Sequence, residues 1–162
     1  MSTIVRAGQG TVHEGPTVGG FASQMVGLGR EAGLQKLGCT LYTVEPGKTS
    51  FPHHWHAANE EAIYILSGRG TLRLGEETHA VGPGDFLGFP TGPAHAHQLI
   101  AAGEEPLRYL CLSTKIDTEI CGYPDSGKVA ALAGSWAAPV FRANFPVEAQ
   151  VDYFHGEPRA KG

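Results

Sequence analysis

Short apolar runs separated by glycine and proline turns constrain the fold of this 162-residue chain more than any other feature. The runs lie at roughly 8–12-residue spacing, which is typical of a β-sandwich or a closed barrel. The expected strands are 37–44, 61–66, 71–74, 78–81, 86–89, 96–101 and 107–113. No strong 3.6-residue periodicity competes with them, and only residues 128–133 favour a turn or two of helix. The sequence therefore predicts an all-β fold.

The composition is that of one turn-rich domain. Hydrophobic residues make up 41% of the chain, enough for a core, and the 23 glycines and 11 prolines supply turns. We expect an irregular N-terminal arm at residues 1–34, a barrel at 35–125 and a C-terminal extension at 126–162. Because the extension carries Phe141, Phe145, Tyr153 and Phe154, we expect it to pack on the barrel.

Charge and cysteine usage exclude several partners. The 12 Lys and Arg against 16 Asp and Glu give a net charge of −4, without a basic run, so nucleic acid is not an expected partner. No apolar stretch approaches the ~18 residues of a membrane span, and the N-terminus lacks the apolar run of a secretory signal. Three cysteines, an odd number without metal-binding spacing, indicate reduced thiols and a cytoplasmic protein.

Six of the eight histidines lie between His53 and His97. In a strand, His54 and His56 share one face, and a turn after them returns Glu61 to the same point. Two imidazoles and a carboxylate suit first-row divalent metals. His95 and His97, again two residues apart, offer a third imidazole.

Two segments carry motifs in which glycines frame these histidines. The first reads Gly47, five residues, the His53–His56 block, Glu60-Glu61 and, after six residues, Gly68; the second reads Gly84-Asp85, Pro90-Thr91-Gly92, His95, His97 and Ala101. They resemble the two motifs of the cupin superfamily, with one extra residue before His54. The second is two residues longer than the family pattern and has Ala101 where that pattern has Asn. The resemblance covers about residues 34–125. Residues 31–38 and 123–126 look like those of small single-domain cupins, some of them loosely labelled sugar-phosphate isomerases.

The resemblance implies one divalent transition-metal ion per chain (Zn, Mn, Fe, Ni or Co) bound by His54, His56, Glu61 and a third histidine. Counting forward from Gly92 selects His95, whereas counting back from 103–109 selects His97. We expect His97 to be the ligand, because it begins a strand-like run while Pro93 favours a loop just before His95. His95 would then lie at the barrel mouth, free to act as a catalytic acid or base.

The resemblance further implies a single jelly-roll barrel, or double-stranded β-helix, that holds a small molecule. It also implies a homodimer formed through the N-terminal segment or outer strands. We expect a metal-dependent enzyme in which the metal acts as a Lewis acid on a sugar, a sugar phosphate or an organic acid. The alternatives are a non-catalytic metal or small-ligand binding protein and an Fe-dependent dioxygenase.

Overall fold

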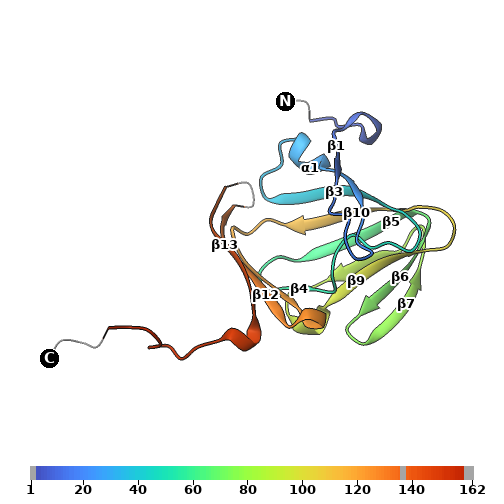
Figure 1. The fold of residues 1–162 in the computed structure, drawn as a ribbon. Helices are drawn as coiled ribbons and strands as arrows, with labels where there is room; N and C mark the ends of the chain where they lie inside the picture. Colours follow the sequence, from blue (N-terminus) through green and yellow to red (C-terminus); the bar gives the residue numbers. More distant parts are fainter. Residues whose placement is uncertain (1–2, 136–137, 159–162) are drawn as a thin grey trace.

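The computed structural model describes residues 3–135 and 138–158, which are mostly antiparallel β-structure (Figure 1). The larger of its sheets has six strands in the order β1-β2-β3-β10-β5-β8. These strands are β1 (Val12–Glu14), β2 (Gln24–Val26), β3 (Leu37–Val44), β10 (Leu107–Thr114), β5 (Glu61–Ser67) and β8 (Phe86–Phe89).

Two smaller sheets complete the described part. A three-stranded sheet has the order β7-β6-β9, and a four-stranded sheet has the order β13-β12-β11-β4. Their strands are β4 (Trp55–His56), β6 (Arg69–Leu74), β7 (Glu77–Val81), β9 (His97–Ala102), β11 (Thr118–Tyr123), β12 (Lys128–Ser135) and β13 (Ala138–Pro146). The short helices are α1 (Leu28–Glu31) and the 3₁₀ turns η1 (Ala7–Gln9), η2 (Pro93–His95), η3 (Pro124–Ser126) and η4 (Val147–Ala149).

The hydrophobic core joins the six-stranded and three-stranded sheets. Burial alternates along β5: Ile63 and Ile65 are buried, whereas Tyr64 and Leu66 are exposed. One face of the strand therefore points into the core. The buried cluster comprises Tyr42, Val44, Ile63, Ile65, Leu72, Val81, Phe89, Leu99, Ala101, Leu107 and Tyr109. Burying each large side chain contributes about 1.5–3 kcal/mol. The core thus confirms the all-β fold that the strand spacing predicts.

The sheets are not closed into a barrel in the described residues. They meet instead at isolated antiparallel bridges, Thr49 with Ile100 and His54 with His97. The second bridge has two hydrogen bonds, from the His54 amide to the His97 carbonyl (3.1 Å) and from the His97 amide to the His54 carbonyl (2.8 Å). It therefore holds two of the predicted ligands side by side.

Gly68 lets the chain pass from the six-stranded sheet at β5 to the three-stranded sheet at β6. Its φ is +78°, a left-handed conformation that favours glycine, and a Cβ at this position would collide with the main chain of Pro106 and Leu107. A side chain at residue 68 would therefore collide with the start of β10, the neighbour of β5 in the six-stranded sheet.

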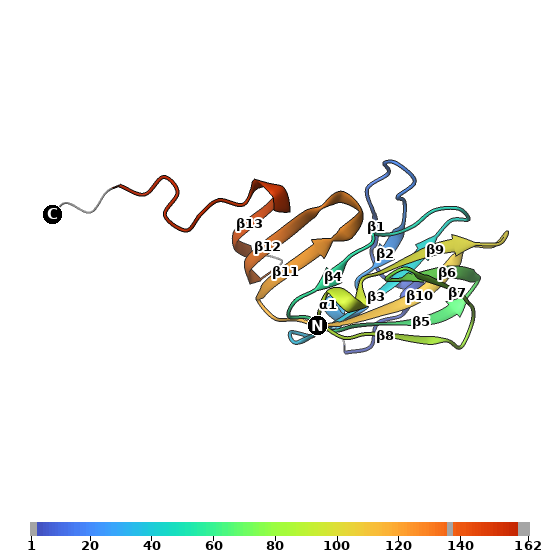
Figure 2. The same ribbon diagram turned by 90° about the horizontal axis from the view of Figure 1, so that it is seen from below.

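Both ends of the chain differ in part from the sequence-based expectation. Residues 1–34 include β1, β2 and α1, because β2 pairs with the edge of β3 and β1 pairs with β2. The helix expected at 128–133 is wrong: these residues form β12, which hydrogen bonds to β11 on one side and β13 on the other. Beyond η4 the chain runs away from the body of the molecule (Figures 1 and 2). Within the described ranges, no helix is both long and apolar enough to span a membrane.

Candidate metal centre and cavity

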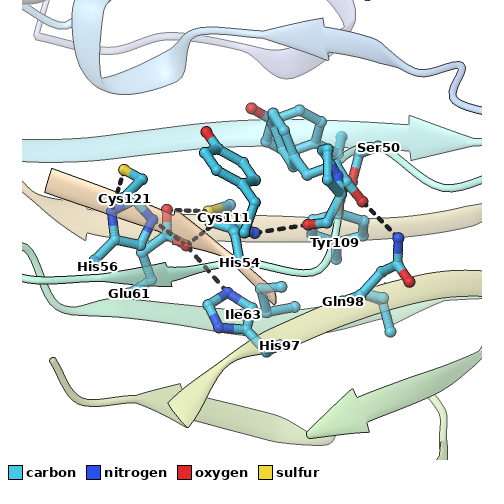
Figure 3. A pocket seen from close by; sticks show the side chains of 15 residues that line it. Ser50, His54, His56, Glu61, Ile63, His97, Gln98, Tyr109, Cys111 and Cys121 are labelled. Carbon is cyan, nitrogen blue, oxygen red and sulfur yellow. Dashed lines mark hydrogen bonds and ion pairs between the residues drawn. The ribbon is translucent and has the colours of Figure 1, made fainter. Parts of the chain in front are cut away.

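Three imidazoles converge on one carboxylate oxygen where β4, β5 and β9 begin or end (Figure 3). The Nε2 atoms of His54, His56 and His97 lie 3.7, 3.4 and 3.2 Å from Oε2 of Glu61. Two atoms that each bond one ion at about 2.0–2.1 Å lie at most ~4.2 Å apart. Each of the three distances to Glu61 lies within that limit. The structure groups His54, His56 and Glu61, whose ligand-type atoms all lie within 4.8 Å of one another, and it places His97 Nε2 beside the same Glu61 oxygen.

The other nitrogen of each ring has an acceptor of its own. The Nδ1–H of His54 donates to the Pro52 carbonyl (2.9 Å), and that of His97 donates to the His95 carbonyl (3.0 Å). His56 Nδ1 lies 3.3 Å from Oε2 of Glu119. With the proton on Nδ1, each Nε2 presents its lone pair to the centre, the arrangement in which a histidine binds metal.

A buried nitrogen without a partner and the chemistry of the donor set also fit a divalent ion. His56 Nε2 is buried and has no hydrogen-bond partner among the described residues. A buried nitrogen without a partner is costly unless something coordinates it. Three imidazoles and one carboxylate form a donor set suited to Fe, Mn, Co, Ni or Zn, and ligand type alone does not choose among them.

The electrostatics of the centre favour a cation. Burial alone would raise the pKa of the Glu61 carboxyl, but the adjacent imidazoles of His54, His56 and His97 outweigh it and lower that pKa well below its usual range. Burial alone would lower the pKa of His56, but its contacts with Cys121, Glu119 and Glu61 raise it to about 12. For His97, burial dominates and lowers the pKa. The negative potential that Glu61 and Glu119 create at His56 stabilises any positive charge there, whether proton or metal ion.

Glu119 is a supporting residue that the sequence analysis missed. Its side chain is almost fully buried, and its two oxygens accept hydrogen bonds from the amides of residues 57, 58, 59 and 120 at 2.9–3.1 Å and from the Asn59 side chain. Burial would raise the pKa of Glu119, but hydrogen bonds from His56, Asn59 and the Ala58 amide outweigh it and lower the pKa to about 2. Glu119 thereby fixes both the His56 ring and the 57–59 turn that returns Glu61 to the centre.

Glu119 and Cys121 also form a second cluster with His56. Their ligand-type atoms all lie within 4.8 Å of one another, with Cys121 Sγ 3.3 Å from His56 Nδ1. Both oxygens of Glu119 already accept several hydrogen bonds, so this cluster supports the first centre rather than forming another. The alternation of Glu119, Cys121 and Tyr123 along a strand was the sequence signal that could have revealed it.

A cavity of about 200 Å³ opens beside the centre. This lies below the ~300–1,000 Å³ of drug-sized ligand sites, so it suits a compact ligand. The hydroxyls of Ser50 and Tyr109 hydrogen bond at 2.5 Å, and Gln98 donates to the Phe51 carbonyl at 3.0 Å. The lining residues are Tyr42, Ser50, Phe51, Pro52, His54, His56, Glu61, Ile63, His97, Gln98, Leu99, Tyr109, Cys111, Cys121 and Tyr123. None of these described residues is Lys or Arg.

His95 lies elsewhere. It ends η2, is half-buried, and is absent from the described residues that line the cavity. Its main-chain carbonyl, however, orients the His97 ring. The acid–base role expected for the His95 side chain stays a prediction, whereas its carbonyl has a visible positioning role.

Known proteins share both the sequence and the fold. Residues 40–113 match the family model of the cupin domain. An uncharacterised protein of Methanocaldococcus jannaschii is 39% identical over 71 residues, which are 41% of this chain, and the match spans 55% of that relative's length.

Two solved structures resemble this one over most of their length. A protein of Acidithiobacillus ferrooxidans, which its name proposes to be a sugar phosphate isomerase, has a TM-score of 0.84 at 28% identity, covering 93% of this chain and 96% of its own. A cupin-superfamily protein of Silicibacter pomeroyi, named as a sugar phosphate isomerase, has a TM-score of 0.80 at 22% identity, with 91% and 94% covered; at that identity it supports the fold alone. The jelly-roll arrangement is supported through these relatives. Residues 40–113 of this chain form a cupin domain.

Proposed function

We propose that this protein is a metal-dependent enzyme that acts on a small oxygen-rich substrate, such as a sugar, a sugar phosphate or an organic acid. The observation that carries the proposal is the convergence of three imidazole Nε2 atoms on one Glu61 oxygen, with every Nδ1 anchored by an acceptor. A divalent ion held by His54, His56, Glu61 and His97 would act as a Lewis acid on a substrate carbonyl or hydroxyl oxygen.

The chain's own residues provide binding and orientation. Aromatic side chains from β3 and β10 wall the cavity, where Tyr42 and Tyr109 stack with ring centroids 5.2 Å apart. The Ser50 and Tyr109 hydroxyl pair offers a donor and an acceptor to a substrate oxygen on the same wall. Tyr123 stacks with the His54 ring at 6.1 Å between centroids, on another side of the cavity. Such walls exclude water and hold a small oxygenated molecule beside the centre.

Non-catalytic ligand binding is a second candidate, and the ionisable groups of the cavity favour it. Burial raises the pKa of Tyr42, Tyr109 and Cys111, so these side chains stay neutral and resist giving up a proton. Glu61 is held as a carboxylate by three imidazoles. A proton-transferring enzyme needs a group that titrates near the working pH, and these four side chains do not supply one.

One experiment distinguishes the two candidates. Protein loaded with Mn²⁺, Fe²⁺, Co²⁺, Ni²⁺ or Zn²⁺ is incubated with aldoses, ketoses, their phosphates and small hydroxy acids, and turnover is followed by proton NMR while binding is measured by calorimetry. The enzyme proposal predicts metal-dependent turnover of at least one compound, which Glu61→Gln abolishes. Binding of a compound without turnover would instead support the ligand-binding candidate. Equal turnover by the metal-loaded protein and by Glu61→Gln would overturn the proposal.

A further inference from the structure

The cavity changes character with distance from the metal centre. Glu61 begins β5 and His97 begins β9, and the next residues on the same faces of these strands are Ile63 and Leu99. Successive residues on one face of a strand lie about 6.6–6.8 Å apart. Ile63 and Leu99 are both buried, and both line the cavity. The centre therefore lies at one end of the cavity, and hydrocarbon begins one step along each strand.

Aromatic rings extend this hydrocarbon region. We call the region the apolar end of the cavity, and its members are Tyr42, Phe51, Ile63, Leu99 and Tyr109. The Phe51 ring meets the Tyr42 ring edge to face, with centroids 5.4 Å apart and an angle of 77° between the planes. The centroid of the Phe51 ring also lies 6.0 Å from that of the His54 ring. Phe51 therefore joins the apolar end to the metal centre.

Polar groups at the apolar end are few (Figure 3). The hydroxyls of Ser50 and Tyr109 are bonded to each other and can serve one ligand oxygen, whereas the Gln98 amide already donates to the Phe51 carbonyl. A polar group that a ligand buries needs a hydrogen-bond partner. The apolar end therefore favours a hydrocarbon group over the several hydroxyls of a sugar.

Charge restricts the ligand further. A phosphate group carries about −1.5 to −2 charge at neutral pH, and proteins hold it with Arg, Lys or helix N-termini. None of the described lining residues is Lys or Arg, and Lys128, whose Nζ lies 4.9 Å from the centre of the Tyr123 ring, is not among them. Because Glu61 would balance one charge of a divalent ion, one ligand carboxylate would balance the other.

Size sets the last limit. The cavity volume is about 200 Å³. An apolar cavity of about 150 Å³ holds benzene, so this one holds a molecule only a little larger. A hexose phosphate exceeds that size, whereas a short-chain acid does not.

We propose that the substrate is a compact monocarboxylic acid with a hydroxyl or oxo group on the α-carbon and a short hydrocarbon side group, which the apolar end selects. The acid's oxygens face the metal centre, and its hydrocarbon packs on Phe51, Ile63 and Leu99. This inference rests on the proposed function, in which an ion at the centre binds substrate oxygens. It narrows the substrate classes named there and removes the sugar phosphates from them.

Calorimetry on the full-length protein loaded with Zn²⁺ tests the apolar end with a series of acids. From glycolate through lactate and α-hydroxybutyrate to α-hydroxyvalerate, affinity should rise roughly fourfold with each added carbon until the cavity is full. Glycerate has a hydroxyl in place of the terminal methyl of α-hydroxybutyrate and should bind roughly tenfold to hundredfold more weakly than that acid. Phosphoglycerate should bind more weakly still.

A variant separates the apolar end from the metal centre. Phe51 is 39% exposed, so Phe51→Ala should fold and keep the metal content of the wild type. It should weaken α-hydroxyvalerate roughly tenfold and leave glycolate, which has no hydrocarbon side group, nearly unchanged. The matched control is Phe86→Ala, at a 65% exposed phenylalanine on β8 that does not line the cavity. Phe86→Ala should bind every acid as the wild type does.

The outcomes distinguish this inference from the proposed function. Affinity that does not rise along the series, or phosphoglycerate that binds more tightly than α-hydroxybutyrate, would overturn the inference. Metal-dependent turnover of a phosphorylated compound would then leave the enzyme proposal standing. Rising affinity without turnover of any acid would support the ligand class and contradict the enzyme proposal. A Phe51→Ala variant that binds the whole series like the wild type would also overturn the inference.

Discussion

Neighbouring residues of β11 meet opposite surroundings. Glu119 and Cys121 point into the body, 2% and 4% exposed, and both contact His56, whereas Ile120 between them is 46% exposed on the opposite face of the sheet. On one side, a buried polar group has a hydrogen-bond partner for each oxygen; on the other, an apolar side chain has little cover. A shift of one residue in the register of this strand would exchange the two sets. The pairing of β11 with β4 therefore decides both where the metal centre is supported and where the apolar surface lies.

The largest expected effect is on the cavity side, at His97. His97→Ala should lower metal occupancy more than tenfold, because it removes one of three converging imidazoles. His95→Ala should keep the metal, since the main-chain carbonyl that orients His97 is retained. Elemental analysis of both variants, purified side by side, checks this. Loss of metal in His95→Ala with retention in His97→Ala would show that His95, and not His97, is the ligand.

The next largest effect concerns stability and compares adjacent residues of β11. Glu119→Ala should lower the free energy of unfolding by about 4 kcal/mol or more, because it leaves four amides without their acceptor at roughly 1–3 kcal/mol each. Ile120→Ala should cost about 1 kcal/mol or less, as its side chain is half exposed. Urea denaturation of the metal-free proteins measures both changes. Similar losses in the free energy of unfolding would contradict the difference between the two faces of β11.

Acid should weaken the cavity side through the same carboxylate. The pKa of Glu119 is lowered from 4.5 to about 2 in the folded protein, so its contribution is complete above the unfolded value and is lost as the pH falls from 4.5 to about 2. A shift of this size corresponds to about 3 kcal/mol at neutral pH. Urea titrations of the metal-free wild type and of Glu119→Gln across this range should converge at low pH. If the free energies of unfolding of the two proteins instead differ by the same amount at every pH, Glu119 does not cause the pH dependence of stability.

The smallest effect tests how tightly β4 packs on β11. A Cβ at Gly122 would overlap the Trp55 ring, which lies against this glycine. Gly122→Ala should therefore destabilise the protein by about 1–3 kcal/mol, the usual range for overpacking. Gly82→Ala, at a glycine whose Cβ would meet nothing within 4 Å, is the control and should change stability little. Thermal unfolding of the two variants gives the comparison.

Local spacing explains why most of the centre could be predicted from the sequence. His54 and His56 share a face because they are two residues apart, and Glu61 begins the next strand after a short turn. Glu119 comes from a strand about 60 residues later in the chain. It reaches His56 through the pairing of β11 with β4, which no local spacing reveals. The supporting carboxylate therefore escaped prediction, whereas His54, His56 and Glu61, which the structure brings together, did not.

Residues 128–133 show how local propensity can point to the wrong secondary structure. The run Lys-Val-Ala-Ala-Leu-Ala is rich in residues that favour helix, and its local propensity points to one. Pairing with β11 on one side and β13 on the other supplies a hydrogen-bonded strand instead. Tertiary pairing thus overrides a weak local preference.

Elemental analysis of wild-type protein purified without added metal tests the central claim most directly. The geometry of His54, His56, Glu61 and His97 predicts one divalent transition-metal ion per chain. The double variant His54→Ala/Glu61→Ala should retain less than roughly a tenth of it, whereas His79→Ala, at a 47% exposed residue paired with Glu77, should retain all of it. A double variant that still carries one ion per chain would contradict the account.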